Sequence, residues 1–122
     1  DALGVDAVEL RTHRHRAGAE HELVEAVVGL ATAVDVARAW NNWFHDTYLK
    51  KSPRFQGLAL IPLQEPEEAV KELRRAVTEL GFCGAMIPST GLKGHLGAKE
   101  YWPVYAEASR LGCCLGVHGS ST

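Results

Sequence analysis

The sequence predicts an α/β fold built on a parallel sheet, because short apolar runs alternate with amphipathic helical patterns. The last three runs recur roughly every 30 residues, which is the length of one β-α-β unit. Each run is mostly apolar, as is typical of parallel strands that are buried on both faces. A doubly wound sheet and a closed barrel both satisfy this alternation, so the pattern leaves the two open.

The expected strands are defined by their apolar runs and by the turn residues around them. They are Val5 to Leu10, Phe55 to Pro62, Gly84 to Ile87 and Cys114 to His118. The first connection is longer than the others, so an insertion is expected after the first strand.

The clearest helical pattern runs from Pro66 to Leu80. Its apolar positions fall on one face at helical spacing, and the other face carries charged residues that include Glu72. Pro66 suits a first helical turn, and Gly81 suits the position just after a helix.

Three further helices are expected along the chain. One runs from about Val34 to Leu49, where Trp40 and Trp43 are interpreted as core residues. Another covers about Glu20 to Leu30. The last runs from about Glu100 to Leu111, with a proline in its first turn and Gly112 at its end.

Composition limits the possible partners and the compartment. The 122 residues are 46% hydrophobic and 23% charged, which is typical of a globular domain with a core. A net charge of -2 argues against nucleic acid or an anionic membrane surface, and no apolar stretch could cross a bilayer. Cys83, Cys113 and Cys114 are expected to be buried free thiols, which favours the reducing cytoplasm.

The ends of the sequence suggest part of a larger domain. Residue 1 is Asp, the first expected strand begins close to it, and the last expected strand ends four residues before the end of the sequence. We therefore expect residues 1–122 to be an internal fragment of one barrel-like domain in a longer protein.

His118 is the main candidate for a functional residue. It lies where the last expected strand ends, and the C-terminal ends of parallel strands carry the active sites of α/β barrels. A neutral imidazole on such a rigid mount is a good metal ligand, and Gly119 allows close approach of the backbone. The alternative is a histidine that only ends a strand.

A second histidine pair competes with this candidate. His13 and His15 follow the first expected strand, and two side chains spaced two residues apart on a strand point the same way. Three arginines flank or separate them, and these guanidinium groups would repel a cation. The alternatives are a basic surface loop, or a role for Arg11 in holding an anionic substrate.

Other polar residues follow the remaining expected strands. Gln64, Ser89 and Thr90 come just after strand ends, where their side chains could face a binding pocket. His95 lies in a loop flanked by glycines that could form a lid. The alternatives are loop or capping roles for the first three, and a surface loop for His95.

A series of motifs carries a family resemblance along most of the chain. The motifs are Asn41-Asn42-Trp43, Pro53-Arg54-Phe55, Ala59-Leu60-Ile61-Pro62-Leu63-Gln64, Glu72-Leu73-Arg74-Arg75-Ala76-Val77, Glu79-Leu80-Gly81-Phe82, Tyr101-Trp102-Pro103-Val104-Tyr105 and Gly116-Val117-His118-Gly119. In this order they resemble the amidohydrolase-related family. That branch of the amidohydrolase superfamily is typified by aminocarboxymuconate semialdehyde decarboxylase and resorcylate-type decarboxylases.

The resemblance implies a distorted (β/α)8 TIM barrel, of which this chain would cover about strands 2 to 5. It also implies one divalent metal ion, usually zinc and sometimes manganese. The family ligands are a His-x-His pair on strand 1, a His on strand 5 and an Asp on strand 8. His118 matches the strand-5 ligand, and the others would lie outside this sequence. Strand 4 lacks the lysine that bridges two metals in binuclear relatives, since Lys93 falls in the following loop.

The expected function follows from that resemblance. It is a mononuclear metal-dependent hydrolase or non-oxidative decarboxylase that acts on a small carboxylate and forms a homodimer at full length. One alternative is a truncated, non-catalytic half-barrel. Another is a metal-free flavodoxin-like binding module, against which the absence of a glycine-rich phosphate-binding turn argues.

Overall fold

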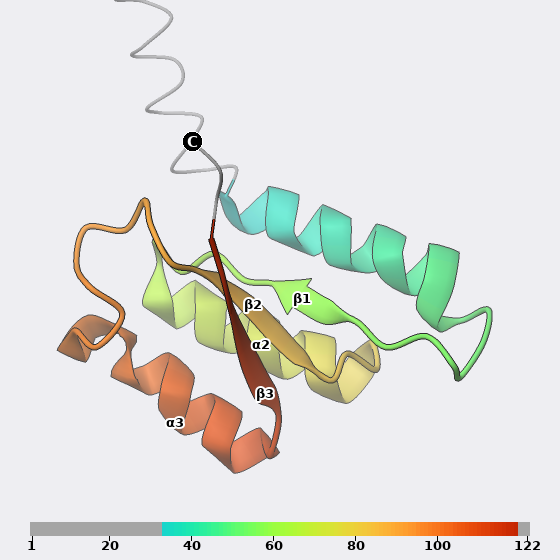
Figure 1. The fold of residues 1–122 in the computed structure, drawn as a ribbon. Coiled ribbons are helices and arrows are strands. Elements are labelled where there is room, and N and C mark those ends of the chain that lie inside the picture. Colours follow the sequence, from blue (N-terminus) through green and yellow to red (C-terminus); the bar gives the residue numbers. More distant parts are fainter. Residues whose placement is uncertain (1–32, 120–122) are drawn as a thin grey trace, which may run out of the picture. The chain divides into compact units, whose positions relative to one another are not determined.

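The computed structural model describes residues 33–119 of the chain. A helix over residues 33–44 continues into the π-helical segment η1 (His45–Leu49). The elements that follow are β1 (Leu58–Leu60), α2 (Pro66–Glu79), β2 (Gly84–Pro88), η2 (Lys99–Tyr101), α3 (Trp102–Leu111) and β3 (Cys114–His118) (Figure 1). The strands and helices alternate along the chain as the sequence predicts.

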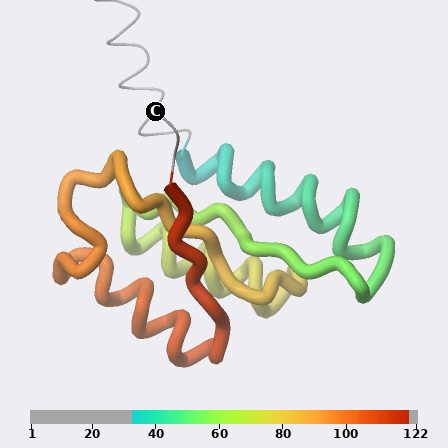
Figure 2. Tube along the Cα trace, in the orientation of Figure 1, coloured from blue at the N-terminus to red at the C-terminus, as the bar shows by residue number. Residues whose placement is uncertain are grey.

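The three strands form a parallel sheet in the order β1-β2-β3. Helix α2 connects β1 to β2, and α3 connects β2 to β3, so each connection returns the chain to the same end of the sheet (Figure 2). The last strand has its predicted bounds. The strand expected over residues 55–62 is shorter, because a tight turn follows it in which the Leu63 N–H donates to the Ile61 carbonyl at 2.9 Å.

The core lies between the sheet and its helices. Ala59, Ala85 and Ile87 point from the strands toward the helices and are at most 3% exposed. The expectation that the strands are buried on both faces is wrong for residues 33–119. Leu58, on the opposite face, is 38% exposed, because helices of the described range cover one face of the sheet only.

Helix α2 forms for the reasons given by its sequence. Pro66 occupies the first turn, and two acidic residues there favour the positive end of the helix dipole. The helix ends at Glu79, Leu80 is its C-cap, and Gly81 follows in the left-handed conformation with φ 74°. One expectation is wrong, since Glu72 is 2% exposed and not on the solvated face. Its carboxylate is held by Arg75, which lies one turn further along.

An ion-pair network centred on one buried carboxylate joins α2 to α3. Glu107 of α3 is 7% exposed and accepts hydrogen bonds from Arg110 at 3.0 Å and from Arg74 of α2 at 2.8 Å. The hydrogen bonds from Arg110, and next those from Arg74, lower the pKa of Glu107 to about 2. The folded chain thus holds this carboxylate in its charged form far into the acid range.

This network predicts a stability contribution that depends on pH. Because the folded-state pKa of Glu107 lies below its ordinary value of 4.5, the contribution is present above pH 4.5 and is lost as the pH falls toward 2. Glu107→Gln should lower the free energy of unfolding by about 1 kcal/mol at pH 7, and by less at pH 3. Denaturant unfolding of the full-length protein at both values would measure this. An equal loss at both would contradict it.

The helix over residues 33–44 buries a different face from the expected one. Ala37 and Asn41 are its buried residues, whereas Trp40 and Trp43 are 43% and 49% exposed. The two indole rings lie 5.1 Å apart, and Trp43 meets the ring of Tyr48 edge-on at 5.8 Å. The indoles therefore form an exposed aromatic row, and the expectation that they pack in the core is wrong for this part of the chain.

The three cysteines are free thiols, but the expectation that all are buried is wrong. Cys83 and Cys114 are exposed, and Cys113 is half-buried, where burial raises the pKa of its thiol. Cys83 comes just before β2, and both its N–H and its S–H donate to the Gly57 carbonyl, at 3.0 and 3.2 Å. Cys83 and Cys113 come just before β2 and β3, Cys114 is the first residue of β3, and Cys113 packs against the core.

Two expected elements lie outside the described residues, namely the strand Val5 to Leu10 and the helix over about residues 20–30. Between residues 33 and 119, none of the helices has the length and apolar character needed to cross a membrane.

Candidate active site at the carboxyl edge of the sheet

His118 is the last residue of β3 and lies at the carboxyl edge of the sheet, as predicted. It is paired in register with Pro88, the last residue of β2. The Ser89 N–H donates to the His118 carbonyl at 3.0 Å. Ser89 and His118 are thus brought together, and the backbone that carries them is fixed on both strands.

The pleat of β3 directs His118 to the face of the sheet opposite the helices. Leu115 packs against the core on the helix side, so residues 114, 116 and 118 alternate to the other face. A side chain built at Gly116 would meet Leu58 Cδ1 at 2.9 Å, which confirms that this face is shared with the first residue of β1. His118 is exposed there, and the same face is the interior when such a sheet closes into a barrel.

The other candidate site residues within 33–119 lie near the same end of the sheet, but the structure does not bring their side chains together. Gln64 is exposed in the turn between β1 and α2. His95 is exposed in the loop after β2, and its Nδ1 accepts the Gly97 N–H at 3.1 Å. With Nδ1 as the acceptor, a neutral His95 ring carries its proton on Nε2, which can act as a donor.

The loop that carries His95 is held to the start of α3. The Trp102 indole N–H donates to the Gly97 carbonyl at 3.1 Å, and the Tyr105 hydroxyl donates to the Leu96 carbonyl. Leu92 and Leu96 also pack against the core. A role for this loop as a lid remains a prediction.

Several predicted site residues fall outside the described range, namely Arg11, His13 and His15. Within residues 33–119, no group of three or more His, Cys, Asp or Glu side chains is placed to hold a metal ion. Lys93 is exposed in the loop after β2, as its sequence position suggests. Of the predicted metal ligands, only His118 lies within residues 33–119.

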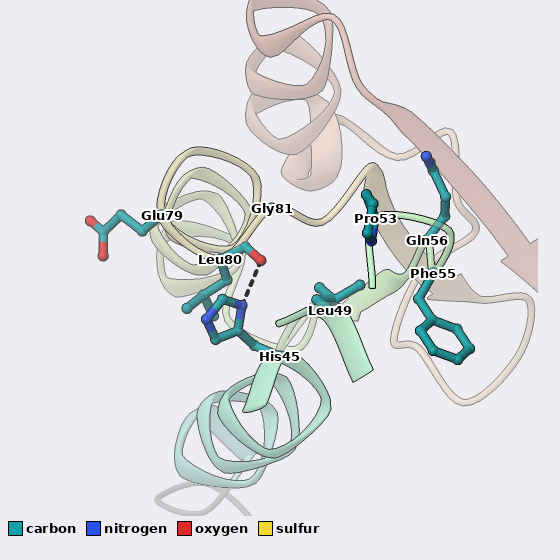
Figure 3. A pocket seen from close by; sticks show the side chains of 8 residues that line it. All are labelled: His45, Leu49, Pro53, Phe55, Gln56, Glu79, Leu80 and Gly81. Atoms are coloured by element: carbon teal, nitrogen blue, oxygen red, sulfur yellow. Dashed lines mark hydrogen bonds between the residues drawn. The ribbon is translucent and has the colours of Figure 1, made fainter. Parts of the chain in front are cut away.

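A hollow of about 390 Å³ lies at the opposite, amino-terminal edge of the sheet. It is lined by residues that precede β1 and β2 and by the end of α2, including His45, Phe55 and Gly81 (Figure 3). The His45 ring bonds the Leu80 carbonyl through Nδ1 at 2.8 Å, while the Glu79 side chain points away from the hollow. His45 thus binds a carbonyl at the end of α2, and we interpret its role as structural.

One feature at the carboxyl end of β1 is only partly evident in the sequence. Asn41 is completely buried and binds both backbone polar groups of Leu60 in β1. The Asn41 carboxamide thus bonds the backbone of a segment 19 residues further along the chain. The additional contact with Glu72 is missed, because helical spacing places that glutamate on the polar face.

The fold and the residues at the carboxyl end of its sheet together define a class of protein. A parallel sheet with returning helices, and a strand-end histidine on the face away from them, is the arrangement of a partial (β/α)8 barrel. The solved structures that the chain matches are barrels of this kind. The amidohydrolase family model matches residues 8–122, and the chain belongs to that family.

The relatives include decarboxylases. Gamma-resorcylate decarboxylase from Rhodococcus jostii is 36% identical over 104 residues, which cover 78% of this chain and 32% of that enzyme. 2-Amino-3-carboxymuconate-6-semialdehyde decarboxylase from Dictyostelium discoideum is 31% identical over 86 residues, covering 70% of this chain and 24% of that enzyme. The chain thus spans a third or less of these curated relatives.

A solved structure gives a similar result. Dihydroxybenzoic acid decarboxylase from Polaromonas sp. JS666, solved with bound manganese and the inhibitor 2-nitroresorcinol, matches with a TM-score of 0.65 and 29% identity. The match covers 73% of this chain and 29% of that one. The family expected from the sequence is confirmed, and so is the partial barrel.

Proposed function

We propose that this chain is part of a metal-dependent, non-oxidative decarboxylase that acts on an aromatic or unsaturated carboxylic acid. The observation that carries the proposal is the position of His118, at a strand end and on the face that becomes the barrel interior. The likeness to decarboxylases supports the reaction class. A hydrolase acting on a lactone, ester or amide is the alternative reaction for the same kind of site.

The donor chemistry at this position suits a divalent ion. An exposed imidazole on a paired strand end offers a fixed nitrogen ligand without large rearrangement. One histidine alone does not hold a metal tightly, so the remaining ligands of our proposal must come from residues outside 33–119. We propose a single ion and favour manganese over the zinc expected from the sequence, because solved relatives contain manganese.

When bound, such an ion would polarise and orient the substrate carboxylate. The described residues would supply the rest of this part of the pocket. His118 would hold the ion, Ser89 would border it, and His95 could donate a hydrogen bond from Nε2 to a substrate oxygen. Gln64 would form the wall on the β1 side. We also propose that Arg11 pairs with the substrate carboxylate.

The reaction class can be tested on the full-length gene product. We expect that protein, reloaded with manganese, to release carbon dioxide from a dihydroxybenzoate and to leave simple esters and lactones intact. Chelation should abolish the reaction, and manganese should restore more of it than zinc does. Ester or lactone hydrolysis without carbon dioxide release would instead establish the hydrolase alternative.

A further inference from the structure

The backbone of β1 has one edge that faces away from β2. The Gly57 carbonyl accepts the Cys83 N–H at 3.0 Å, so the peptide groups of residue 57 face β2. In a parallel strand the N–H and C=O of one residue point to the same side, and successive residues alternate sides. The peptide groups of Leu58 and Leu60 therefore point to the other edge, where a further strand would pair.

At Leu60 this edge is already occupied by a side chain. The Leu60 N–H donates to Asn41 Oδ1 at 2.9 Å, and Asn41 Nδ2 donates to the Leu60 carbonyl at 2.8 Å. A carboxamide carries the same donor and acceptor as a peptide group, so it reproduces both bonds of a strand partner. Asn41 is 0% exposed, which excludes water as a competitor for these bonds.

A second set of contacts fixes the carboxamide in this position. Asn41 Nδ2 also donates to Glu72 Oε1 at 2.8 Å. Glu72 in turn receives Arg75 Nε at 2.9 Å and Nη2 at 2.7 Å, and Arg75 Nη1 donates to Asn42 Oδ1 at 2.9 Å. Movement of Asn41 away from Leu60 would leave part of a buried carboxylate unsatisfied, which is costly.

We propose that Asn41 takes the place of a neighbouring strand beside Leu60 and acts as a positioning residue for the carboxyl edge. Any strand that adds to this edge of β1 pairs as far as Leu58 and separates from β1 there. The gap that results between β1 and such a strand opens at the carboxyl end of the sheet, where His118 lies. Asn41 sets its width and the direction in which β1 enters the turn over residues 61–65.

The consequence for a substrate follows from that turn. Residues 61–63 are buried, and the turn is closed by the bonds Leu63 N–H to Ile61 O and Glu65 N–H to Pro62 O, both 2.9 Å. Gln64 is therefore carried rigidly by Leu60. Loss of Asn41 should shift this wall of the pocket and leave His118, two strands away, in place. The expected effect on activity rests on the proposed function, whereas the hydrogen bonds between Asn41 and Leu60 do not depend on it.

Hydrogen exchange of the full-length protein tests the geometry directly. In Asn41→Ala, the Leu60 amide should exchange at least about tenfold faster than in the wild type, because its acceptor is gone. The matched control is Asn42→Ala, which removes a contact of Arg75 only and should leave Leu60 protected. If the Leu60 amide stays protected in folded Asn41→Ala, another strand pairs there and the proposal is wrong.

A double variant separates positioning from general stability. Asn41→Asp places a second carboxylate beside Glu72, and adding Glu72→Gln provides an amide donor that restores that contact. The double variant should regain the thermal stability lost in Asn41→Asp. It still lacks a side-chain donor for the Leu60 carbonyl. Its KM should stay raised, by roughly tenfold, with kcat within about twofold of wild type. Full recovery of KM together with stability would show a purely structural role.

Metal content keeps the two proposals distinguishable. The Asn41 variants should bind as much manganese as the wild type, since none of their contacts reaches His118. If the wild type binds no metal, the proposed function fails, and the exchange of the Leu60 amide still decides the role of Asn41.

Discussion

Replacing His118 with alanine should remove most of the bound divalent metal from the full-length protein and lower kcat/KM by more than about 100-fold. Loss of an outer-shell partner of a metal ligand already costs about 10–100-fold, and loss of a ligand itself should cost more. His118 pairs with Pro88 through its backbone, so the side chain can be removed without breaking the sheet. Elemental analysis and steady-state kinetics measure the two effects.

The matched control for that variant is His45→Ala at the opposite edge of the sheet. His45 binds the Leu80 carbonyl and lies in the hollow before β1, so its loss should reduce stability slightly and leave the metal content unchanged. An unchanged metal content in folded His118→Ala would exclude His118 as a ligand and remove the main support for the proposed function.

Replacing Gly84 with alanine should destabilise the protein by about 3 kcal/mol or more, the upper range for overpacking a core. A Cβ at Gly84 would lie 1.9 Å from the Cys114 carbonyl oxygen and 2.8 Å from its carbon. These are backbone atoms of the residue paired with Gly84, so relief requires β2 and β3 to separate. We expect a melting temperature lower by roughly 5–10 °C, or loss of soluble protein.

Gly116→Ala is the control for that prediction, because it adds the same methyl group to the same face of the sheet. The nearest atom to its new Cβ is Leu58 Cδ1 at 2.9 Å, the end of a flexible side chain that can rotate away. The expected loss is about 1 kcal/mol or less. Equal losses in the two variants would show that contact with the Cys114 backbone does not explain the need for glycine at position 84.

Local sequence patterns were sufficient to predict the alternating strands and helices. The apolar spacing and end residues of α2 predict its bounds to within one residue, since Pro66 and Gly81 have conformational preferences that tertiary contacts do not change. The run from Cys114 to His118 predicts β3 with its bounds. A strand-end histidine is visible in the sequence because the strand, the preceding helix end and the histidine are contiguous.

Burial was less predictable, because it depends on contacts between distant segments. Glu72 occupies a polar position by spacing, yet it is buried because Asn41 and Arg75 satisfy its charge. Trp40 is a large apolar residue of the kind usually found in a core, yet it is exposed. The buried residues of its helix are instead the small Ala37 and the hydrogen-bonding Asn41. Side-chain type alone cannot show which face of a helix meets a strand edge.

The sequence by itself determined the α/β alternation, the family and the residue that ends β3 as the candidate ligand. These rest on local preferences and on motifs in a fixed order. Only the tertiary structure decided that His118 points to the face away from the helices, that Ser89 pairs with its backbone, and that Asn41 occupies the edge of β1. The physical reason is that register and hydrogen-bond pairing join residues 19 to 31 positions apart, which no local pattern specifies.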